Sequence, residues 1–446
     1  MNIKRIIEVF GCVMIMVNPL ASSAQSAPVD TTKIVKVVDY AYKMETERNL
    51  PEAAHYYAIA VKLASTDIER ASLNYQLGNV LQDLKKNVEA QDAYKEAVGF
   101  YNKVNSIKKG GVDEELAATL NDLGNSYYYS KMWKEADKIL SEADSVRTIL
   151  VKKSPVDYEP LLGRTLYNLA NVQYQEKKLS EAFANYNRAK DIAEKYYATD
   201  STAYKKQIAM ILNNLGALSM EMNDKTFAEE CYKKLLNIYN SNNADNGSKY
   251  ILNKAIAYDN LGGLYLDQKR YEEAGKMLNA AVMEYKKLGN DKAYENRILS
   301  ILTLLSVTNY SMKNYAEAIP TLEYLAEIYE KNGEKELLAD TYKRLAKCYI
   351  YTSAFPKAEA IADKAIALGG AAADEIKADK TLAVLLQGRY DEAKDLYSSV
   401  KNKIMSNGNV CRQYIQAFLG DLAGAGIISP EMAKKDVKKF KKLINK

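Results

Sequence analysis

The chain has 446 residues, and 48% of them are hydrophobic, which is enough apolar material for a large folded core. Its net charge of +5 is concentrated in residues 430–446, where seven lysines face two acidic residues, so the rest of the chain is close to neutral and binding to nucleic acid is not expected. One histidine and four cysteines without CxxC spacing argue against a metal site, a disulfide framework or a cofactor.

Residues 1–24 are predicted to be an export signal. Lys4 and Arg5 precede an apolar run over residues 9–17, and small residues at 22–24 offer a cleavage site. We therefore expect an exported protein, in the periplasm, at the cell surface or secreted, with no transmembrane span in the mature chain. Cys12 resembles a lipobox cysteine, but the short apolar stretch before it and the bulky Phe10 argue against a lipid anchor. Residues 25–33 are predicted to be a linker.

Two series of small residues then recur with a step of 46 residues. Their members are Gly78, Gly124, Ala170, Gly216 and Gly262, and Ala90, Ala136, Ala182, Ala228 and Ala274. Two series with one period predict a solenoid of stacked repeats. A solenoid presents a long surface built from equivalent positions, so we expect a binding surface and not a catalytic pocket.

Each repeat is predicted to be a helical hairpin. Leu120, Leu123 and Tyr127 recur at helical spacing, and Ala136 and Leu140 do so again after a short turn. Nine units are expected in an array over residues 34–407, followed by capping helices over residues 408–446. The units begin near Ile34, Ala71, Ala117, Gly163, Ala209, Ala255, Leu299, Ala339 and Asp374.

The order Leu-Gly, Tyr, Ala, large residue, Ala within a unit resembles the tetratricopeptide repeat. The 46-residue step, the missing proline at the end of each unit and the Asn-x-Leu-Gly sequences at 121–124 and 213–216 are similar to the long-repeat, kinesin-light-chain-like type. The resemblance implies an all-α, right-handed superhelical solenoid of antiparallel helix pairs. It also implies a non-enzymatic scaffold for protein–protein interaction, which binds an extended peptide or a partner protein in its concave groove.

The resemblance further implies that certain positions of the first helix in each unit face the groove. Asparagines there offer a donor and an acceptor to a peptide backbone, and tyrosines offer flat contact area. The same asparagines could instead hold neighbouring repeats together, and the sequence leaves both interpretations open. The candidate residues are Asn79, Asn121, Asn125, Asn171, Asn213, Tyr75, Tyr128, Tyr167 and Tyr174.

Two charged segments suggest further alternatives. A clamp for a carboxylate is not expected beside the asparagines, where Arg164 is the only basic groove residue, but Lys343, Arg344 and Lys347 could hold an acidic patch. The C-terminal helix is basic and amphipathic. It could lie on an anionic membrane or close the last repeat, and its apolar stripe is Ala433, Val437, Phe440 and Ile444.

Catalysis is not expected, because the chain lacks GxSxG, phosphate-loop and HExxH motifs and a second histidine. The predicted partner is a protein or a peptide. The alternatives are a glycan- or nutrient-binding envelope protein and a sensor or adaptor of a signalling system. The sequence does not give the oligomeric state.

Overall fold

The computed structural model describes residues 32–241, 247–289, 291–369, 373–406 and 408–444. The predicted signal at residues 1–24, Cys12 and most of the predicted linker lie outside these residues. Within them the chain is helical, and the one β-type contact is an isolated bridge between Ile404 and Val410. The chain divides into two compact units, residues up to Val172 and residues from Gln173, and each is described by itself.

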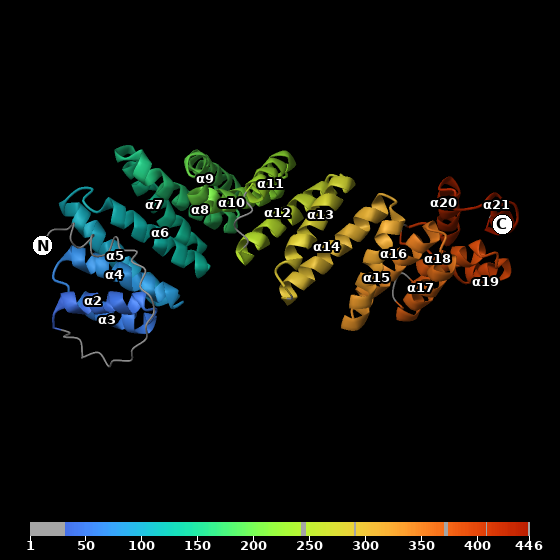
Figure 1. Cartoon of the computed structure of the whole chain (residues 1–446), viewed down its shortest axis with the longest axis horizontal. Coiled ribbons are helices and arrows are strands. Elements are labelled where there is room, and N and C mark those ends of the chain that lie inside the picture. Colours follow the sequence, from blue (N-terminus) through green and yellow to red (C-terminus); the bar gives the residue numbers. More distant parts are fainter. Residues whose placement is uncertain (1–31, 242–246, 290, 370–372, 407, 445–446) are drawn as a thin grey trace. The chain divides into compact units, whose positions relative to one another are not determined.

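Unit 1 consists of helix pairs that pack against one another in chain order (Figure 1). The pairs are α2 with α3, α4 with α5, and α6 with α7, and α8 follows, with the boundary between the units near its end. The bounds are α2 (Ile34–Thr46), α3 (Leu50–Leu63), α4 (Asp67–Asp83), α5 (Asn87–Ile107), α6 (Asp113–Tyr129), α7 (Trp133–Lys153) and α8 (Pro155–Gln175).

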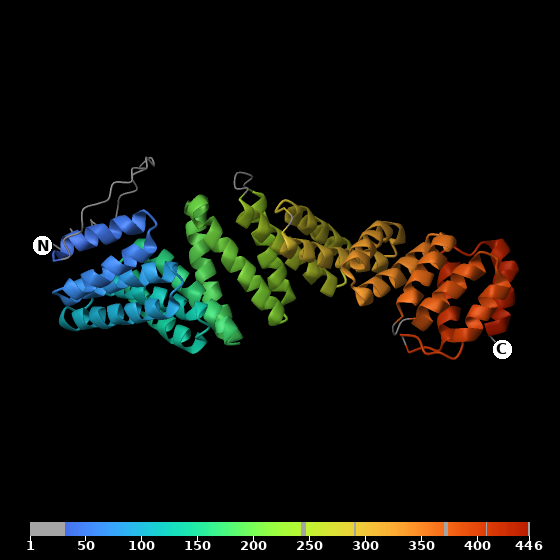
Figure 2. The same cartoon turned by 90° about the horizontal axis from the view of Figure 1, so that it is seen from below.

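Unit 2 continues the same pattern of consecutive packed helices (Figure 2). Its helices are α9 (Leu179–Thr199), α10 (Ser201–Glu221), α11 (Lys225–Asn240), α12 (Ser248–Asp267), α13 (Tyr271–Lys286), α14 (Lys292–Ser311), α15 (Tyr315–Asn332), α16 (Lys335–Tyr351), α17 (Phe355–Leu368), α18 (Ala373–Leu386), α19 (Tyr390–Val400), α20 (Cys411–Gly424), α21 (Pro430–Lys434) and α22 (Asp436–Ile444). The predicted all-helical repeat architecture is confirmed.

The small residues of the 46-residue series allow the two helices of each hairpin to pack closely. A Cβ atom added to Gly78 would lie 2.6 Å from the ring of Tyr94, and one added to Gly124 would lie 2.5 Å from Cγ of Leu140. Real side chains do not tolerate such distances, so the hairpin needs a residue without Cβ there or a local shift of the partner side chain. The alanines of the second series, from Ala90 to Ala274, are fully buried.

The turn inside each hairpin has nearly the same backbone conformation throughout the described repeats. One residue there has a positive φ, near 60°, although it is not glycine in the first eight hairpins, and Gly388 takes this position in the ninth. This left-handed conformation reverses the chain over very few residues. The eight residues are Arg48, Lys85, Lys131, Lys177, Asn223, Lys269, Lys313 and Ser353.

Without a repeat-terminal proline, the second helices in the middle of the array are long. Helices α5, α7 and α9 each have 21 residues. They run through Asn102, Thr148 and Glu194, the positions where a proline would interrupt backbone hydrogen bonding. The extra length of the 46-residue repeat is therefore partly absorbed by longer helices.

The C-terminal helices close the last repeat of unit 2. Val437, Phe440 and Ile444 of α22 are buried in one core with residues of α18, α19 and α20. The lysines of the described part of α22 are exposed. The stripe of α22 thus packs as a capping element does, and its apolar side chains are covered by protein.

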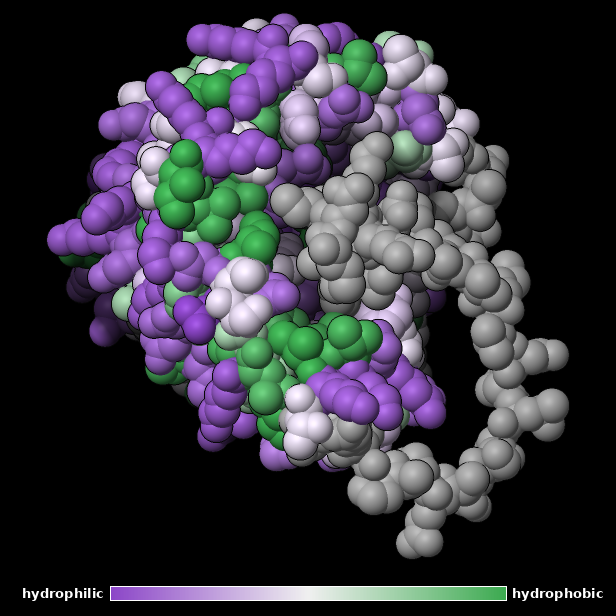
Figure 3. Space-filling view, turned by 90° about the vertical axis from the view of Figure 1, so that its left-hand side faces the viewer, coloured by the Kyte–Doolittle hydropathy of each residue, from purple (hydrophilic) through white to green (hydrophobic). Residues whose placement is uncertain are grey.

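No helix among the described residues is long and apolar enough to cross a membrane. Figure 3 shows the face at the N-terminal end, where hydrophilic side chains cover much of the visible surface and hydrophobic ones form separate patches.

Candidate functional site

Unit 1 brings most of the predicted residues onto three first helices, α4, α6 and α8. We call this set the first-helix face. It consists of Tyr75, Asn79, Asn121, Asn125, Tyr128, Tyr167 and Asn171. Six of the seven are partly exposed, and Asn121 is buried. The predicted groove residues of unit 1 are therefore not all at the surface, because Asn121 lies inside the protein.

Asn121 belongs to a buried hydrogen-bond network between α6, α7 and α8. Its Oδ1 accepts hydrogen bonds from Thr165 Oγ1 and Asn168 Nδ2, each at 3.1 Å. Arg147 Nη1 donates to Thr165 Oγ1 at 2.5 Å and also to the backbone oxygen of Leu161. Burial lowers the pKa of the Arg147 guanidinium to about 10. In this network Asn121 holds neighbouring repeats together, the second of the two interpretations that the sequence allows.

Tyr75 and Asn79 also have partners in unit 1. The Tyr75 hydroxyl donates to Asp122 Oδ2 at 2.8 Å, and the Tyr94 hydroxyl donates to Asn79 Oδ1 at 2.8 Å. Burial, and then the charge of Asp122, raise the pKa of Tyr75, so it stays a hydrogen-bond donor at neutral pH. Tyr167 and Asn171 likewise interact with other residues of the chain.

Asn125 differs from the other asparagines of this face. It is partly exposed, and across the described part of the chain its carboxamide makes no hydrogen bond. One turn further along α6, the ring of Tyr128 lies 5.2 Å from the ring of Trp133. The side chain of Arg164, on α8, is exposed. Asn125 thus has both donor and acceptor capacity available to a ligand.

The two predicted residues in unit 2 are engaged within the protein. Tyr174 hydrogen bonds to Glu221, and Lys177 Nζ lies 5.4 Å from its ring centre. Asn213 Nδ2 donates to Asn214 Oδ1 at 3.2 Å, and Asn213 Oδ1 is buried without a hydrogen-bond donor among the described residues. Tyr174 lies on α8 three residues after Asn171, just past the boundary between the units, whereas Asn213 lies on α10.

The alternative of an acidic patch held by three basic residues is not supported. Lys343 and Lys347 both pair with Glu375, at 3.0 Å and 2.9 Å, and Arg344 pairs with Asp340 at 2.8 Å. These cations are already neutralised by acidic residues of the chain.

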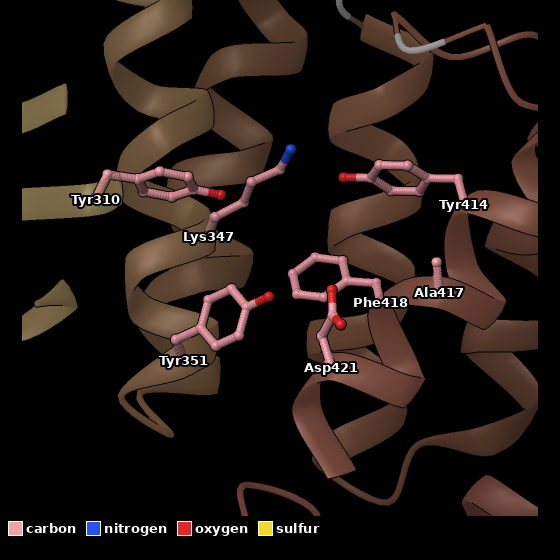
Figure 4. Close-up of a pocket in the computed structure, with 7 residues that line it drawn as sticks. All are labelled: Tyr310, Lys347, Tyr351, Tyr414, Ala417, Phe418 and Asp421. Carbon is pink, nitrogen blue, oxygen red and sulfur yellow. The ribbon is translucent and has the colours of Figure 1, made fainter. Parts of the chain in front are cut away.

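Unit 2 contains a cavity that the sequence did not predict. Tyr310 of α14 and Lys347 and Tyr351 of α16 face Tyr414, Ala417, Phe418 and Asp421 of α20 across a space of about 200 Å³ (Figure 4). The Lys347 ammonium and the Asp421 carboxylate lie at opposite ends of this group of side chains (Figure 4). In Figure 4, Tyr310 and Tyr414 lie on either side of Lys347, and Phe418 lies next to Asp421.

A buried ionic cluster supports one side of the cavity. The Tyr414 hydroxyl donates to Asp379 Oδ1 at 2.5 Å, and Lys347 Nζ lies 3.8 Å from Asp379 Oδ2. Burial raises the pKa of Asp379 to about 6, although the charge of Lys347 opposes this shift. Burial would also raise the pKa of Glu375, but hydrogen bonds from Ser406 and Lys347 lower it to about 2. Burial raises the pKa of Tyr310 to about 12.

The sequence did not predict this cavity because one wall lies on the repeat helices α14 and α16 and the other lies on α20, which follows the last repeat. Tyr310 and Tyr351 lie at the ends of repeat helices, where the 46-residue alignment no longer holds. Tyr414, Phe418 and Asp421 lie on α20, after the last repeat. The available signal was the spacing of Tyr414, Phe418 and Asp421 at four and three residues, which places all three on one helix face.

Comparison with known proteins identifies the repeats. Residues 161–241 and residues 255–288 each match a family model described as tetratricopeptide repeat. The fold is an array of helical hairpins with a candidate binding face, and the chain contains tetratricopeptide repeats in these two segments. No curated protein sequence matches the chain.

Solved structures with similar folds have low sequence identity to this chain. The apo form of RapI is 16% identical, with a TM-score of 0.48, and the alignment covers 82% of this chain and 95% of RapI. A putative kinesin light chain from P. anserina with nearly identical TPR-like repeats is 13% identical, with a TM-score of 0.40 and coverage of 50% and 98%. YrrB, described as a TPR protein with an unusual peptide-binding site, is 17% identical, with a TM-score of 0.34 and coverage of 47% and 88%.

The described residues contain no group of three or more His, Cys, Asp or Glu side chains placed to hold a metal ion. The three cysteines that the structure describes, Cys231, Cys348 and Cys411, are buried and unpaired, and burial raises the pKa of each thiol. A buried thiol with a raised pKa is a poor nucleophile.

Proposed function

We propose that this chain is a non-enzymatic scaffold that binds an extended peptide segment of a partner protein along the first-helix face of unit 1. Tetratricopeptide-repeat proteins are generally protein-interaction scaffolds. The observation that carries the finer proposal is the partly exposed asparagine that returns one residue after the small residue of α4, α6 and α8. Of these three, Asn125 has a carboxamide with no hydrogen bond among the described residues.

The chemistry of this face suits a peptide backbone. A carboxamide both donates and accepts, so it can pair with a peptide group in an extended segment whatever the neighbouring side chains are. Tyr128 adds a rigid aromatic surface one turn away, and Arg164 adds an exposed donor. Binding would thus depend on the main chain of the partner for affinity and on its side chains for selection.

The test is selection of binders from a display library of random linear peptides against the purified chain. The strongest peptide is then titrated against the parent and against the double substitution Asn125→Ala with Asn171→Ala. We expect affinity to fall by at least about tenfold, the equivalent of about 1.4 kcal/mol. The matched control replaces Lys138 and Glu142 by Ala, two exposed residues on α7, the second helix of the same repeat.

Thermal unfolding followed by the fluorescence of Trp133, the only tryptophan, shows whether the variants keep unit 1 folded. Asn121→Ala is unsuitable as a binding test, because it leaves Thr165 and Asn168 without their acceptor and costs about 1–3 kcal/mol of stability. If the folded double variant binds its peptides as tightly as the parent, the first-helix face is not the peptide site.

Export of the protein is also part of the proposal. It is supported by the basic residues, the apolar run and the small residues of the first 24 positions. Expression of the chain with and without residues 1–24 and fractionation of the cells tests it. Identical distribution of the two forms would contradict it.

A further inference from the structure

The cavity between α14, α16 and α20 has rigid aromatic walls. The ring of Tyr351 stacks on Tyr315, with centres 4.1 Å apart and planes 7° from parallel, and its centre lies 5.4 Å from that of Phe418. The rings of Phe418 and Tyr414 are 6.1 Å apart. Rings fixed by such contacts present their faces and edges without reordering when a ligand enters.

The charges around this cavity leave one acidic group without a counter-ion. Lys347 is paired with Glu375 at 2.9 Å and lies near Asp379, and Lys343 pairs with the same Glu375. Two cations therefore face two carboxyl groups on that side. Asp421, at the other end, is exposed and has no ion pair among the described residues.

An uncompensated carboxylate beside aromatic rings favours a cationic ligand. Aromatic faces attract cations, and this attraction is strongest where water is partly removed. Arginine suits such a site better than lysine, because its planar guanidinium stacks on rings and pairs with both oxygens of a carboxylate. A space of about 200 Å³ is smaller than the pockets of drug-sized ligands, which start at about 300 Å³, and it suits one side chain.

We propose that this cavity binds the guanidinium of an arginine side chain presented by a partner protein, with Asp421 as its counter-ion and Phe418 and Tyr351 as its aromatic walls. The site lies in unit 2 and uses none of the residues of the first-helix face. It rests on the proposed function only in that the arginine belongs to a protein partner, and either site can fail its test while the other passes.

The experiment titrates the purified chain with two blocked tripeptides, acetyl-Gly-Arg-Gly-amide and acetyl-Gly-citrulline-Gly-amide, by ligand-observed NMR. Citrulline has nearly the same shape as arginine but no charge. We expect the arginine peptide to bind at least about tenfold more tightly to the parent protein, a ratio that corresponds to about 1.4 kcal/mol. In Asp421→Asn this preference should disappear, because replacing arginine by citrulline and replacing Asp421 by Asn remove the same ion pair.

The matched control is Asp395→Asn, which removes an exposed acidic residue of α19 outside the cavity and should keep the preference. Tyr351→Phe retains the ring and removes only the hydroxyl, so it should change the affinity by less than about twofold. Asn125→Ala should leave arginine binding unchanged, which separates this test from that of the first-helix face.

Three results would overturn the proposal. The first is equal binding of the arginine and citrulline peptides by the parent. The second is a preference for arginine that survives in folded Asp421→Asn, and circular dichroism establishes that this variant is folded. The third is binding of a neutral monosaccharide, such as methyl glucoside, in the absence of any arginine binding, which would assign the cavity to sugars.

Discussion

At the scale of single residues, three asparagines in equivalent positions have different roles because of what lies opposite them. Tyr94 donates its hydroxyl to Asn79, whereas the residue equivalent to Tyr94 in the next repeat is Leu140, which has no polar atom to offer Asn125. The same comparison is visible in the sequence, since Tyr94 and Leu140 are 46 residues apart. The exposed polar group is therefore a consequence of one tyrosine-to-leucine difference.

Asp379 gives a prediction about pH at this scale. Its folded-state pKa of about 6 lies above the ordinary value of 3.8, so the folded chain holds the proton more tightly than the unfolded chain does. The resulting stabilisation is full below about pH 3.8 and is lost as the pH rises through 6. At about 1.4 kcal/mol for each unit of pKa, the full effect is about 3 kcal/mol, and we expect the stability of Asp379→Asn relative to the parent to rise by about 2 kcal/mol of this between pH 4 and pH 7.

Urea unfolding followed by circular dichroism at the two pH values measures this difference. Glu375→Gln is the matched control, with the opposite sign. The folded-state pKa of Glu375 is about 2, so the stability that it contributes is full above about pH 4.5 and is lost as the pH falls toward 2. If the difference between Asp379→Asn and the parent is the same at pH 4 and pH 7, Asp379 does not titrate as described.

At the scale of helices and turns, the sequence predicts the array well and the turns poorly. Periodic apolar residues such as Leu120 and Leu123 identify the helices because burial repeats every three or four residues. The left-handed residue of each turn is mostly lysine, a residue type without any preference for positive φ, so no turn signal marks it. Its position follows instead from the packing of the two helices that it connects.

The turn between α6 and α7 allows a test of this argument. Lys131 has a φ of 59°, where a Cβ atom costs about 1 kcal/mol, so Lys131→Gly should raise the free energy of unfolding by up to that amount. Lys138→Gly, on the exposed surface of α7, should lower it by about 1 kcal/mol, because glycine disfavours a helix interior. Urea unfolding followed by Trp133 fluorescence reports on both. A loss of equal size in the two variants would contradict the assignment of the turn.

At the scale of the whole molecule, the periodic spacing of small and apolar residues predicts the repeats but not the structure that follows the last repeat. The hairpins of the described residues follow from the repeat pattern, and the cavity does not, because α20 lies after the last repeat and lines the cavity together with α14 and α16. The first-helix face was predicted as a set of residues, but not the buried environment of Asn121. That environment depends on Thr165 and Arg147, two residues without counterparts at every repeat.

Because the turns of adjacent hairpins have nearly the same geometry, one whole repeat can be deleted without changing the turn that joins the remaining helices. Lys86 and Met132 follow the left-handed lysines of adjacent repeats with nearly the same backbone, φ −87° and ψ 65° against φ −88° and ψ 69°. Deleting residues 86–131 joins Lys85 to Met132 and sets Gly78 opposite Leu140, the partner that Gly124 has now.

The shortened chain should unfold cooperatively, with Trp133 as the probe, because every junction keeps a geometry that already exists in the protein. A deletion of half that length, which joins helix faces out of phase, should not give a folded unit 1. Similar unfolding curves for the two deletions would mean that phase is unimportant. If they differ as expected, this protein can be shortened only by whole hairpins.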